Sequence, residues 1–252
     1  MKLKIRLLIL LTIVILGSWH SAQAGEFNQS QKTEIERILR DYLLKNPEVL
    51  YEAMQALEQR QTENAAKQQQ EQIEKQKSEI YHSDEDFVAG NPKGDIALVE
   101  FFDYNCGYCQ RSMPDVKKLI ATDRGLRVIF KEFPILGTGS TFAAKAAIAA
   151  MKQGKYLQLH EALYEHRGTK DEASVLTIAK KVGLDVDRLK KDMTDPKIQA
   201  VIEQNAKLAA ALKIDGTPGF LIDKKVIQGA AGFDALAAEI ATTRKAGGCQ
   251  VC

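Results

Sequence analysis

The sequence predicts an α/β domain with a helix-rich insertion, and a separate helical extension on its N-terminal side. Two apolar runs, residues 96–102 and 126–133, have the length and composition of buried strands and are separated by a helical segment. Residues 141–212 are rich in helix-forming patterns and precede two further short strands. Residues 31–57 repeat apolar side chains at helical spacing well before the first strand.

Residues 1–24 have the pattern of a secretory signal peptide. Lys2, Lys4 and Arg6 precede the apolar run 7–16, and an Ala-Gln-Ala sequence at 22–24 offers a cleavage site. The run is short for a membrane span, and an uncleaved anchor is the alternative. Removing this segment with its three cations changes the formal charge from +2 to −1, which gives no reason to expect nucleic acid as a partner. We expect export to the periplasm.

Residues 25–82 are predicted to form a helical arm and a connector. Asn46-Pro47 interrupts the helical pattern of residues 31–57, and proline suits the first turn of a second helix. Residues 58–77 are rich in Gln, Glu and Lys, so they cannot form a core, and a solvated helical connector is favoured over disorder. The apolar face of residues 31–57 either folds back onto the main domain or binds another copy. The long connector favours self-association as a homodimer or homotrimer.

Residues 83–246 contain the elements of the α/β domain. A turn at 91–94 precedes the strand 96–102, and a helix follows at 109–121, where Pro114 is expected to introduce a kink. The second strand, residues 126–133, leads into a helical insertion at about 138–212, which Gly154, Gly168 and Gly183 divide. Short strands at 219–223 and 226–228 are joined by a tight turn, and a final helix covers 233–244.

The pair Cys106 and Cys109 is the most informative motif in the chain. It lies where the first strand gives way to a helix, with Gly107 and Tyr108 between the two thiols. The free N–H groups and dipole of a helix N-terminus stabilise a thiolate, so Cys106 is expected to be the nucleophile. Cys109, one turn further, would resolve a mixed disulfide. Half of a zinc site is the alternative, which the strand-to-helix context disfavours.

The residues around this pair resemble the active site of the DsbA-like branch of the thioredoxin superfamily. The matching segment is Val-Glu-Phe-Phe-Asp-Tyr-Asn-Cys-Gly-Tyr-Cys at 99–109. Val-Ile-Phe-Lys-Glu-Phe-Pro at 128–134 resembles the next strand of that family, and Gly-Thr-Pro-Gly-Phe at 216–220 resembles its cis-proline loop. The resemblance implies a thioredoxin fold with an inserted helical domain. The helical extension is similar, in composition, to that of dimerising or trimerising members, including periplasmic isomerase-like proteins.

The resemblance also implies roles for four more residues. Pro218 would form a cis peptide bond beside the cysteines and expose the backbone of Thr217 for pairing with an extended substrate. Thr at this position is common in isomerases and reductases of the family, whereas oxidases often carry Val. Glu100 and Lys131, on adjacent predicted strands, match charged positions that help move the proton of the buried thiol. A surface ion pair is the alternative for these two.

The last six residues, 247–252, depart from the family pattern. Cys249 and Cys252 follow two glycines, so a flexible tail with a local disulfide or an unstructured end is expected. A redox relay to Cys106 or a metal-binding pair stays open. The histidines outside the signal, including His160, lack metal-ligand spacing, so surface or cap roles are expected and no metal site is predicted.

These features together predict a periplasmic protein disulfide oxidoreductase or isomerase that needs no organic cofactor. Its expected partners are exported proteins with cysteines and a membrane redox partner, either a DsbD-like reductase or a DsbB-like oxidase. A DsbA-type dithiol oxidase without isomerase activity is the alternative within the class. A metal-binding or chaperone module whose cysteine pairs are not catalytic is the alternative outside it.

Overall fold

The computed structural model describes residues 26–252, so the predicted signal peptide lies outside the described residues. The chain divides after Gln61 into two units, an N-terminal arm and a larger domain. No helix among residues 26–252 is long and apolar enough to cross a membrane.

The arm consists of α2 (Gln29–Lys45) and the first part of α3 (Glu48–Lys75). Asn28 and Gln31 form a capping box that starts α2, and the Asn46 side chain donates to the Tyr42 carbonyl at its end, 2.8 Å away. None of the residues of α2 is buried. The polar residues 58–75 continue α3, so the connector is helical rather than disordered.

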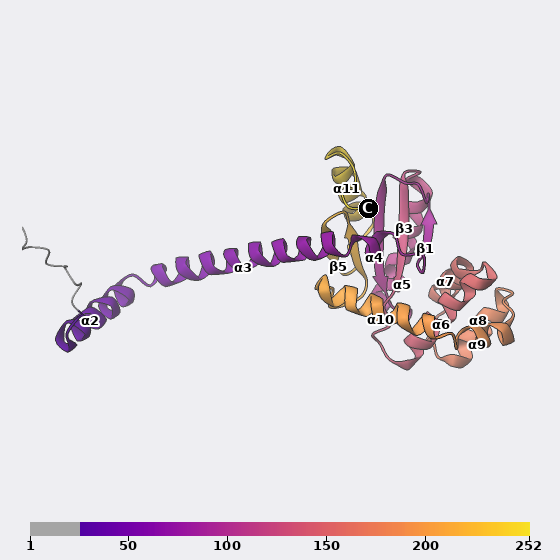
Figure 1. Cartoon of the computed structure of the whole chain (residues 1–252), viewed down its shortest axis with the longest axis horizontal. Coiled ribbons are helices and arrows are strands. Elements are labelled where there is room, and N and C mark those ends of the chain that lie inside the picture. The colour runs from indigo at the N-terminus through magenta and orange to yellow at the C-terminus, as the bar shows by residue number, and fades with distance from the viewer. Residues whose placement is uncertain (1–25) are drawn as a thin grey trace, which may run out of the picture. The chain divides into compact units, whose positions relative to one another are not determined.

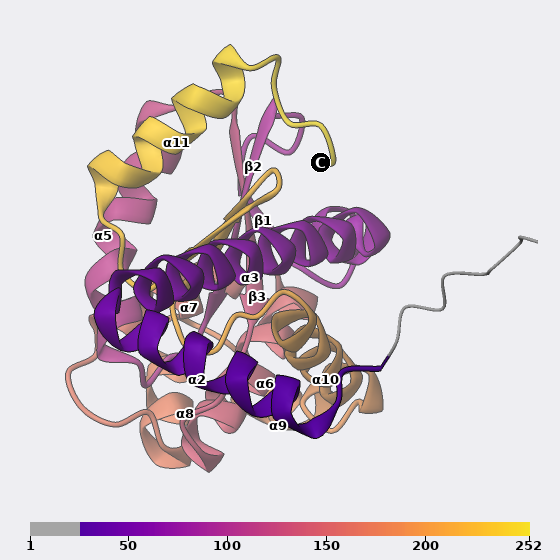
Figure 2. The ribbon, with the colours of Figure 1, turned by 90° about the vertical axis from the view of Figure 1, so that its left-hand side faces the viewer.

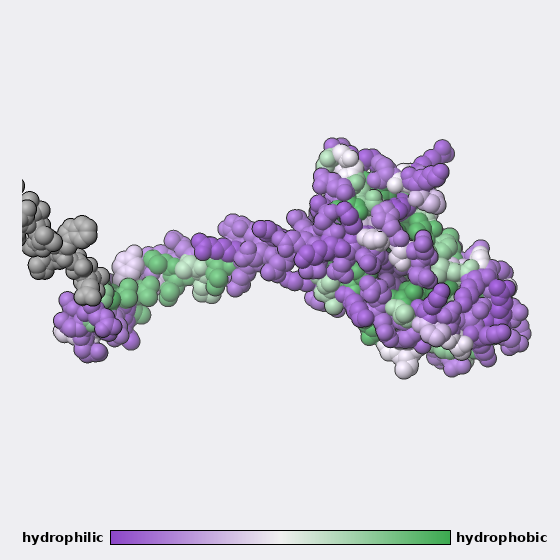
Figure 3. All heavy atoms as spheres, in the orientation of Figure 1, coloured by the Kyte–Doolittle hydropathy of each residue, from purple (hydrophilic) through white to green (hydrophobic). Residues whose placement is uncertain are grey.

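Apolar side chains of the arm gather in a stripe on its surface, green in Figure 3. Leu39, Leu50, Met54 and Leu57 are each more than half exposed. Single exposed apolar side chains are ordinary in soluble proteins, whereas a contiguous group marks an interaction surface. The arm therefore presents an apolar face that its own residues do not cover.

The domain is built on a five-stranded sheet in the order β1-β3-β2-β4-β5. β2 (Ile96–Phe102) and β3 (Leu126–Glu132) pair in parallel through the crossover helix α5 (Gly107–Thr122). The sequence patterns indicated these three elements to within two residues. β4 (Gly219–Ile222) pairs antiparallel with β2, and β5 (Lys225–Gln228) pairs antiparallel with β4. The edge strand β1 (Phe87–Gly90), which was not predicted, pairs antiparallel with β3.

The alternating side chains of β2 divide the core into two clusters. Ile96, Leu98 and Phe102 pack in one cluster, whereas Val99 and Phe101 pack in the other. The first cluster includes side chains from α5, from the helical insertion and from α11 (Phe233–Lys245). Figure 2 shows α11 beside α5. The second cluster includes the end of α3, α4 (Lys77–Tyr81) and α10 (Pro196–Ala211).

The helical insertion contains α6 (Thr138–Ala150), η1 (Met151–Gln153), α7 (Tyr156–Glu165), α8 (Glu172–Lys181), α9 (Val186–Asp192) and α10. Figure 1 shows α6 to α9 grouped together at one side of the sheet. Eight of the thirteen residues of α6 are buried, and its alanines allow close approach of neighbouring helices. The predicted thioredoxin fold with an inserted helical domain is confirmed by this arrangement.

The C-terminal tail is ordered against the domain, which corrects the expectation of a flexible end. Cys249 and Cys252 form a disulfide, and Val251 is buried in the second core cluster. The Gln250 backbone N–H donates to the Asp223 carboxylate at 2.9 Å. The two glycines before Cys249 suggested a flexible tail, but burial of the Val251 side chain holds the tail against the domain.

Candidate active site

Cys106 lies at the junction of the β2–α5 connection and the first turn of α5. It is the N-cap residue of that helix, with its backbone N–H donated to the Asp103 carbonyl at 3.1 Å. Gly107 and Tyr108 form the first helical positions, and Cys109 follows in the same turn. The N–H groups of this turn have no partner within the helix, so they are available to a thiolate at Cys106.

The two thiols have opposite acid–base character. Hydrogen bonding from the Cys109 thiol, and then from Thr217 and from the Cys109 and Tyr108 amides, lowers the pKa of Cys106 from 9.0 to about 5. Burial raises the pKa of Cys109 well above its usual value, and the neighbouring Cys106 and Glu100 add to that rise. Cys106 is therefore a thiolate at neutral pH, while Cys109 keeps its proton until a base removes it.

The cis-proline loop faces the nucleophile. The Thr217–Pro218 peptide bond is cis, as predicted from the resemblance. The Cys106 sulfur lies 3.1 Å from the Thr217 carbonyl oxygen, to which it donates when protonated, so the two segments are in direct contact. Thr217 is half-buried, and β4 begins directly after Pro218. The structure thus brings the predicted nucleophile and the predicted substrate-binding residues together.

Glu100 is buried in β2 on the face of the sheet that carries the cysteines. It points to the same face of the strand as Leu98 and Phe102, which belong to the same core cluster as Cys106 and Cys109. Burial and, as the smaller cause, the charge of the Cys106 thiolate together raise the pKa of Glu100 to about 8. A carboxyl group that titrates near neutrality can accept and release a proton, as a general base requires.

Lys131 does not reach the cysteine pair, which corrects its expected role there. Lys131 is opposite Phe101 in the β2–β3 register, so its side chain points to the other face of the sheet from Glu100. Its ammonium group forms a buried ion pair with Asp86 and donates to the Glu79 carbonyl. Adjacent strands were predicted correctly, but the register that decides the face could not be obtained from two isolated strand patterns.

A buried carboxylate, that of Asp103, supports the active-site turn. Asp103 Oδ1 accepts from the Asn105 N–H at 2.7 Å and from the Ser140 hydroxyl at 2.7 Å. Oδ2 accepts from the Ile135 and Leu136 N–H groups at 2.8 and 2.9 Å. Asp followed two residues later by a polar residue is a turn signal, which could have identified its local role.

A second buried polar cluster lies beside this turn and involves His160, contrary to the expected surface or cap role. The Tyr104 and Tyr156 hydroxyls donate to Glu132 Oε1 at 3.0 and 2.8 Å, and Tyr104 Oη is 2.9 Å from His160 Nδ1. Burial raises the pKa of Glu132 and lowers that of His160 to about 3. Burial therefore favours the uncharged form of both groups, a protonated Glu132 and a neutral His160.

The second cysteine pair is remote from Cys106 along the sheet. β4 begins at the cis-proline loop and ends at the turn that contains Asp223, and the tail packs on that turn. The Cys249–Cys252 disulfide therefore lies at the opposite end of β4 from Cys106. Among residues 26–252, no three side chains of the His, Cys, Asp and Glu types lie close enough together to hold a metal ion.

Two family models match this chain. The model of the DSBA-like thioredoxin domain matches residues 97–241, which include the cysteine pair, the helical insertion and the cis-proline loop. The model of the copper resistance protein ScsC N-terminal domain matches residues 31–63, within the helical arm and connector.

Solved structures share the same fold. A thioredoxin-like oxidoreductase from Silicibacter pomeroyi is 42% identical, with a TM-score of 0.66, and the match covers 67% of this chain and 97% of that one. A linker-deletion variant of Proteus mirabilis ScsC is 26% identical over 88% of this chain and 99% of its own, with a TM-score of 0.67. A periplasmic thioredoxin-like protein from Salmonella enterica serovar Typhimurium is 27% identical over 66% and 93%, with a TM-score of 0.60.

Curated relatives match through a part of their length. The Na⁺/H⁺ antiporter NhaA 3 of Salinispora tropica is 28% identical over 159 residues, which is 62% of this chain and 24% of that protein. The chain thus spans about a quarter of that relative, and the similarity does not assign ion transport to it.

Proposed function

The chain belongs to the family of the DSBA-like thioredoxin domain, and on that premise we propose that it is a thiol–disulfide oxidoreductase that forms or isomerises disulfide bonds in exported proteins. The observation that carries this proposal is the contact of a low-pKa Cys106 with a buried Cys109 and with the cis-proline loop. This combination supplies a nucleophile, a resolving thiol and a backbone edge for substrate at one place.

The reaction uses the cysteine pair as its only electron carrier. In the reducing direction, the Cys106 thiolate attacks a substrate disulfide, forms a mixed disulfide and releases one substrate thiolate, which takes a proton from solvent. Cys109 then loses its proton and attacks the Cys106 sulfur. The second substrate thiol leaves, and two electrons have passed from the pair to the substrate. Disulfide formation in a substrate dithiol is the reverse sequence.

Isomerisation stops at the mixed disulfide. Another thiolate of the same substrate attacks the substrate sulfur that is bonded to Cys106. A new substrate disulfide forms, and Cys106 leaves as a thiolate with no net change in electrons. A low pKa makes Cys106 a good leaving group in this step. Thr217 beside the nucleophile supports this direction, because Thr is common there in isomerases of the family that the chain resembles.

Glu100 is the group best placed to accept the Cys109 proton. It is buried on the same face as the pair, and its raised pKa of about 8 keeps it able to exchange a proton near neutral pH. Gly107 and Tyr108 tune the thiolate, since the Tyr108 amide is one of the donors that lower the pKa of Cys106. Lys131 has no part in this scheme.

The exposed apolar stripe of the arm supports self-association as a homodimer or homotrimer. An oligomer would present several active sites to one substrate, which raises the effective concentration of thiolates around it. The signal-like N-terminus supports a periplasmic location, where disulfides persist. The pair must then be reset by a membrane redox partner, a DsbD-like reductase for an isomerase or a DsbB-like oxidase for an oxidase.

A dithiol oxidase is the second candidate, and the pKa of Cys106 favours it. Stabilising the thiolate stabilises the reduced protein, so the oxidised pair becomes a stronger electron acceptor. Refolding of scrambled ribonuclease and oxidation of reduced ribonuclease separate the two candidates. Activity on the reduced substrate alone would eliminate isomerisation.

One substitution tests the catalytic role common to both candidates. Cys106→Ala should abolish insulin reduction. Unchanged activity in this variant would contradict the mechanism and favour a metal-binding or chaperone module.

A further inference from the structure

Outside the arm, the large exposed apolar side chains of the described residues belong to two segments, the first turn of α5 and the loop between β3 and α6. Tyr108, Ile135 and Leu136 are 60%, 43% and 53% exposed, and they are the large exposed apolar residues of the domain. Tyr108 lies between the two catalytic cysteines, and the other two belong to the loop between β3 and α6. Apolar surface next to a reactive sulfur indicates contact with a partner rather than chance exposure.

The domain holds the loop in this exposed state by a buried carboxylate. Asp103, three residues before Cys106, accepts from the N–H groups of both Ile135 and Leu136 at 2.8 and 2.9 Å. Asn105, directly before Cys106, donates to the Ser140 hydroxyl at 3.1 Å at the start of α6. The turn that carries the nucleophile and the loop that carries the apolar side chains are therefore one hydrogen-bonded unit.

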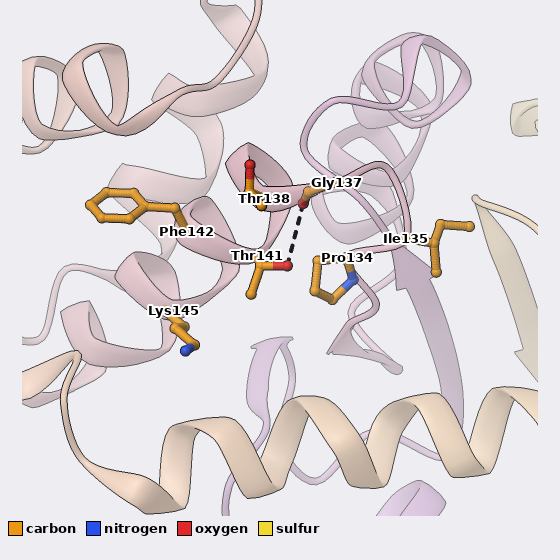
Figure 4. A pocket seen from close by; sticks show the side chains of 7 residues that line it. All are labelled: Pro134, Ile135, Gly137, Thr138, Thr141, Phe142 and Lys145. Carbon is orange, nitrogen blue, oxygen red and sulfur yellow. Dashed lines mark hydrogen bonds between the residues drawn. The ribbon is translucent and has the colours of Figure 1, made fainter.

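A hollow opens next to this loop. Figure 4 shows Pro134 and Ile135 from the loop on one side of it, and Thr141, Phe142 and Lys145 from α6 on the other. Its volume is about 510 Å³, within the range of sites that bind small ligands or side chains. The apolar part of its lining suits an aliphatic or aromatic side chain.

Lys145 gives the hollow a charge preference. It is half-buried on α6, one turn from Thr141, and no carboxylate of the described residues forms an ion pair with it. An ammonium group at the edge of an apolar hollow favours a carboxylate on whatever occupies it.

We propose that this hollow, which Ile135 lines and which Leu136 follows in the same loop, is a substrate subsite that binds an extended polypeptide carrying a large apolar residue and an acidic residue near its reactive cysteine. The inference rests on the proposed function, since Cys106 must exchange with polypeptide cysteines. An extended chain fits because Thr217, beside Cys106, offers a backbone edge, and the loop with Ile135 is hydrogen-bonded to the turn that carries Cys106.

The test uses two-cysteine peptides of equal length and the oxidised full chain. A parent peptide contains Leu and Glu beside one cysteine, at several spacings, and its matched forms carry Leu→Ser, Glu→Gln or Glu→Lys. At the best spacing, we expect kcat/KM to fall by about tenfold for the Leu→Ser peptide and by about threefold for the Glu→Gln peptide.

Protein variants identify where the selectivity arises. An Ile135→Ser, Leu136→Ser double variant should lose the preference for Leu, and Lys145→Glu should reverse the preference between Glu and Lys peptides. Lys93→Glu, an exposed position in the turn before β2 and remote from the site, is the matched control and should change neither preference.

Exchange with dithiothreitol separates this proposal from the underlying function. All variants should oxidise dithiothreitol as the wild type does, because none of the changed side chains contacts the sulfur atoms. A wild type that does not oxidise dithiothreitol would refute the proposed function itself. Two results would contradict the proposed subsite. One is equal kcat/KM of the wild type for the parent and altered peptides, and the other is unchanged selectivity in the variants at Ile135, Leu136 and Lys145.

Discussion

The stability of the reduced protein should depend on pH through Cys106. The fold lowers the pKa of this thiol from 9.0 to about 5, whereas the unfolded chain leaves it at its usual value. The lowered pKa therefore gives its full stabilisation of the folded protein above about pH 9. This stabilisation declines as the pH falls and disappears below about pH 5. Cys106→Ala removes the contribution at every pH, so it is the perturbation that isolates it.

The size of the effect follows from the interval between the two pKa values. Each pH unit between 5 and 9 changes the free energy of unfolding by about 1.4 kcal/mol, so the contribution at pH 7 is about 3 kcal/mol. Packing lost in the alanine variant is the same at every pH. The difference between wild type and variant should thus grow by roughly 3 kcal/mol between pH 5 and pH 7.

Guanidinium-induced unfolding under excess reductant measures this difference. Far-UV circular dichroism is the suitable probe, since the one tryptophan, Trp19, lies in the predicted signal peptide. The Cys106 thiolate also raises the pKa of Glu100, so both proteins are compared again in a Glu100→Gln background. Absorbance of the thiolate gives the midpoint of its titration independently.

A difference between wild type and Cys106→Ala that stays constant from pH 5 to pH 8 would refute this reasoning. So would a thiolate titration with its midpoint near 9. Either result would mean that the hydrogen-bond donors at the start of α5 and the Thr217 side chain do not stabilise the anion.

Three further predictions concern the residues around the site and the arm. The raised pKa of Glu100 stabilises the fold below about pH 4.5, and this contribution is lost as the pH rises to about 8. The free energy of unfolding of Glu100→Gln minus that of the wild type should therefore be about 3 kcal/mol larger at pH 7 than at pH 4, and the variant should release mixed disulfides more slowly. Equal pH dependence of stability in the two proteins would contradict a buried acid at this position. Asp103→Ala should lower the free energy of unfolding by about 3 kcal/mol, since it removes the acceptor of four hydrogen bonds, and a loss under 1 kcal/mol would show that the loop does not need it. Leu50→Glu with Met54→Glu should convert the full chain to a monomer in sedimentation equilibrium with insulin reduction retained, and a monomeric wild type would rule out self-association.

Local sequence patterns were sufficient for most of the catalytic geometry. The first strand, the cysteine pair and the following helix are adjacent in sequence, so one short segment determines the thiolate environment of Cys106. The cis bond at Pro218 came from the resemblance, since base rates alone favour a trans bond.

Long-range register accounts for what could not be predicted. Lys131 was assigned to the wrong face because a shift of one residue in strand pairing reverses the direction of a side chain. The contact of Asp103 with Ile135 and Leu136 joins segments more than thirty residues apart, and no spacing in the sequence indicates it. Burial of Val251 likewise depends on the second core cluster, which is assembled from distant elements.

Trapping of the mixed disulfide tests the central claim most directly. Cys109→Ala in the reduced state should accumulate a covalent complex with a disulfide-bonded substrate, and peptide mass mapping should place the bond at Cys106. The matched Cys106→Ala variant should form none. Accumulation through Cys109 in the Cys106→Ala variant, or at Cys249 or Cys252 in either protein, would contradict the assignment of Cys106 as the nucleophile.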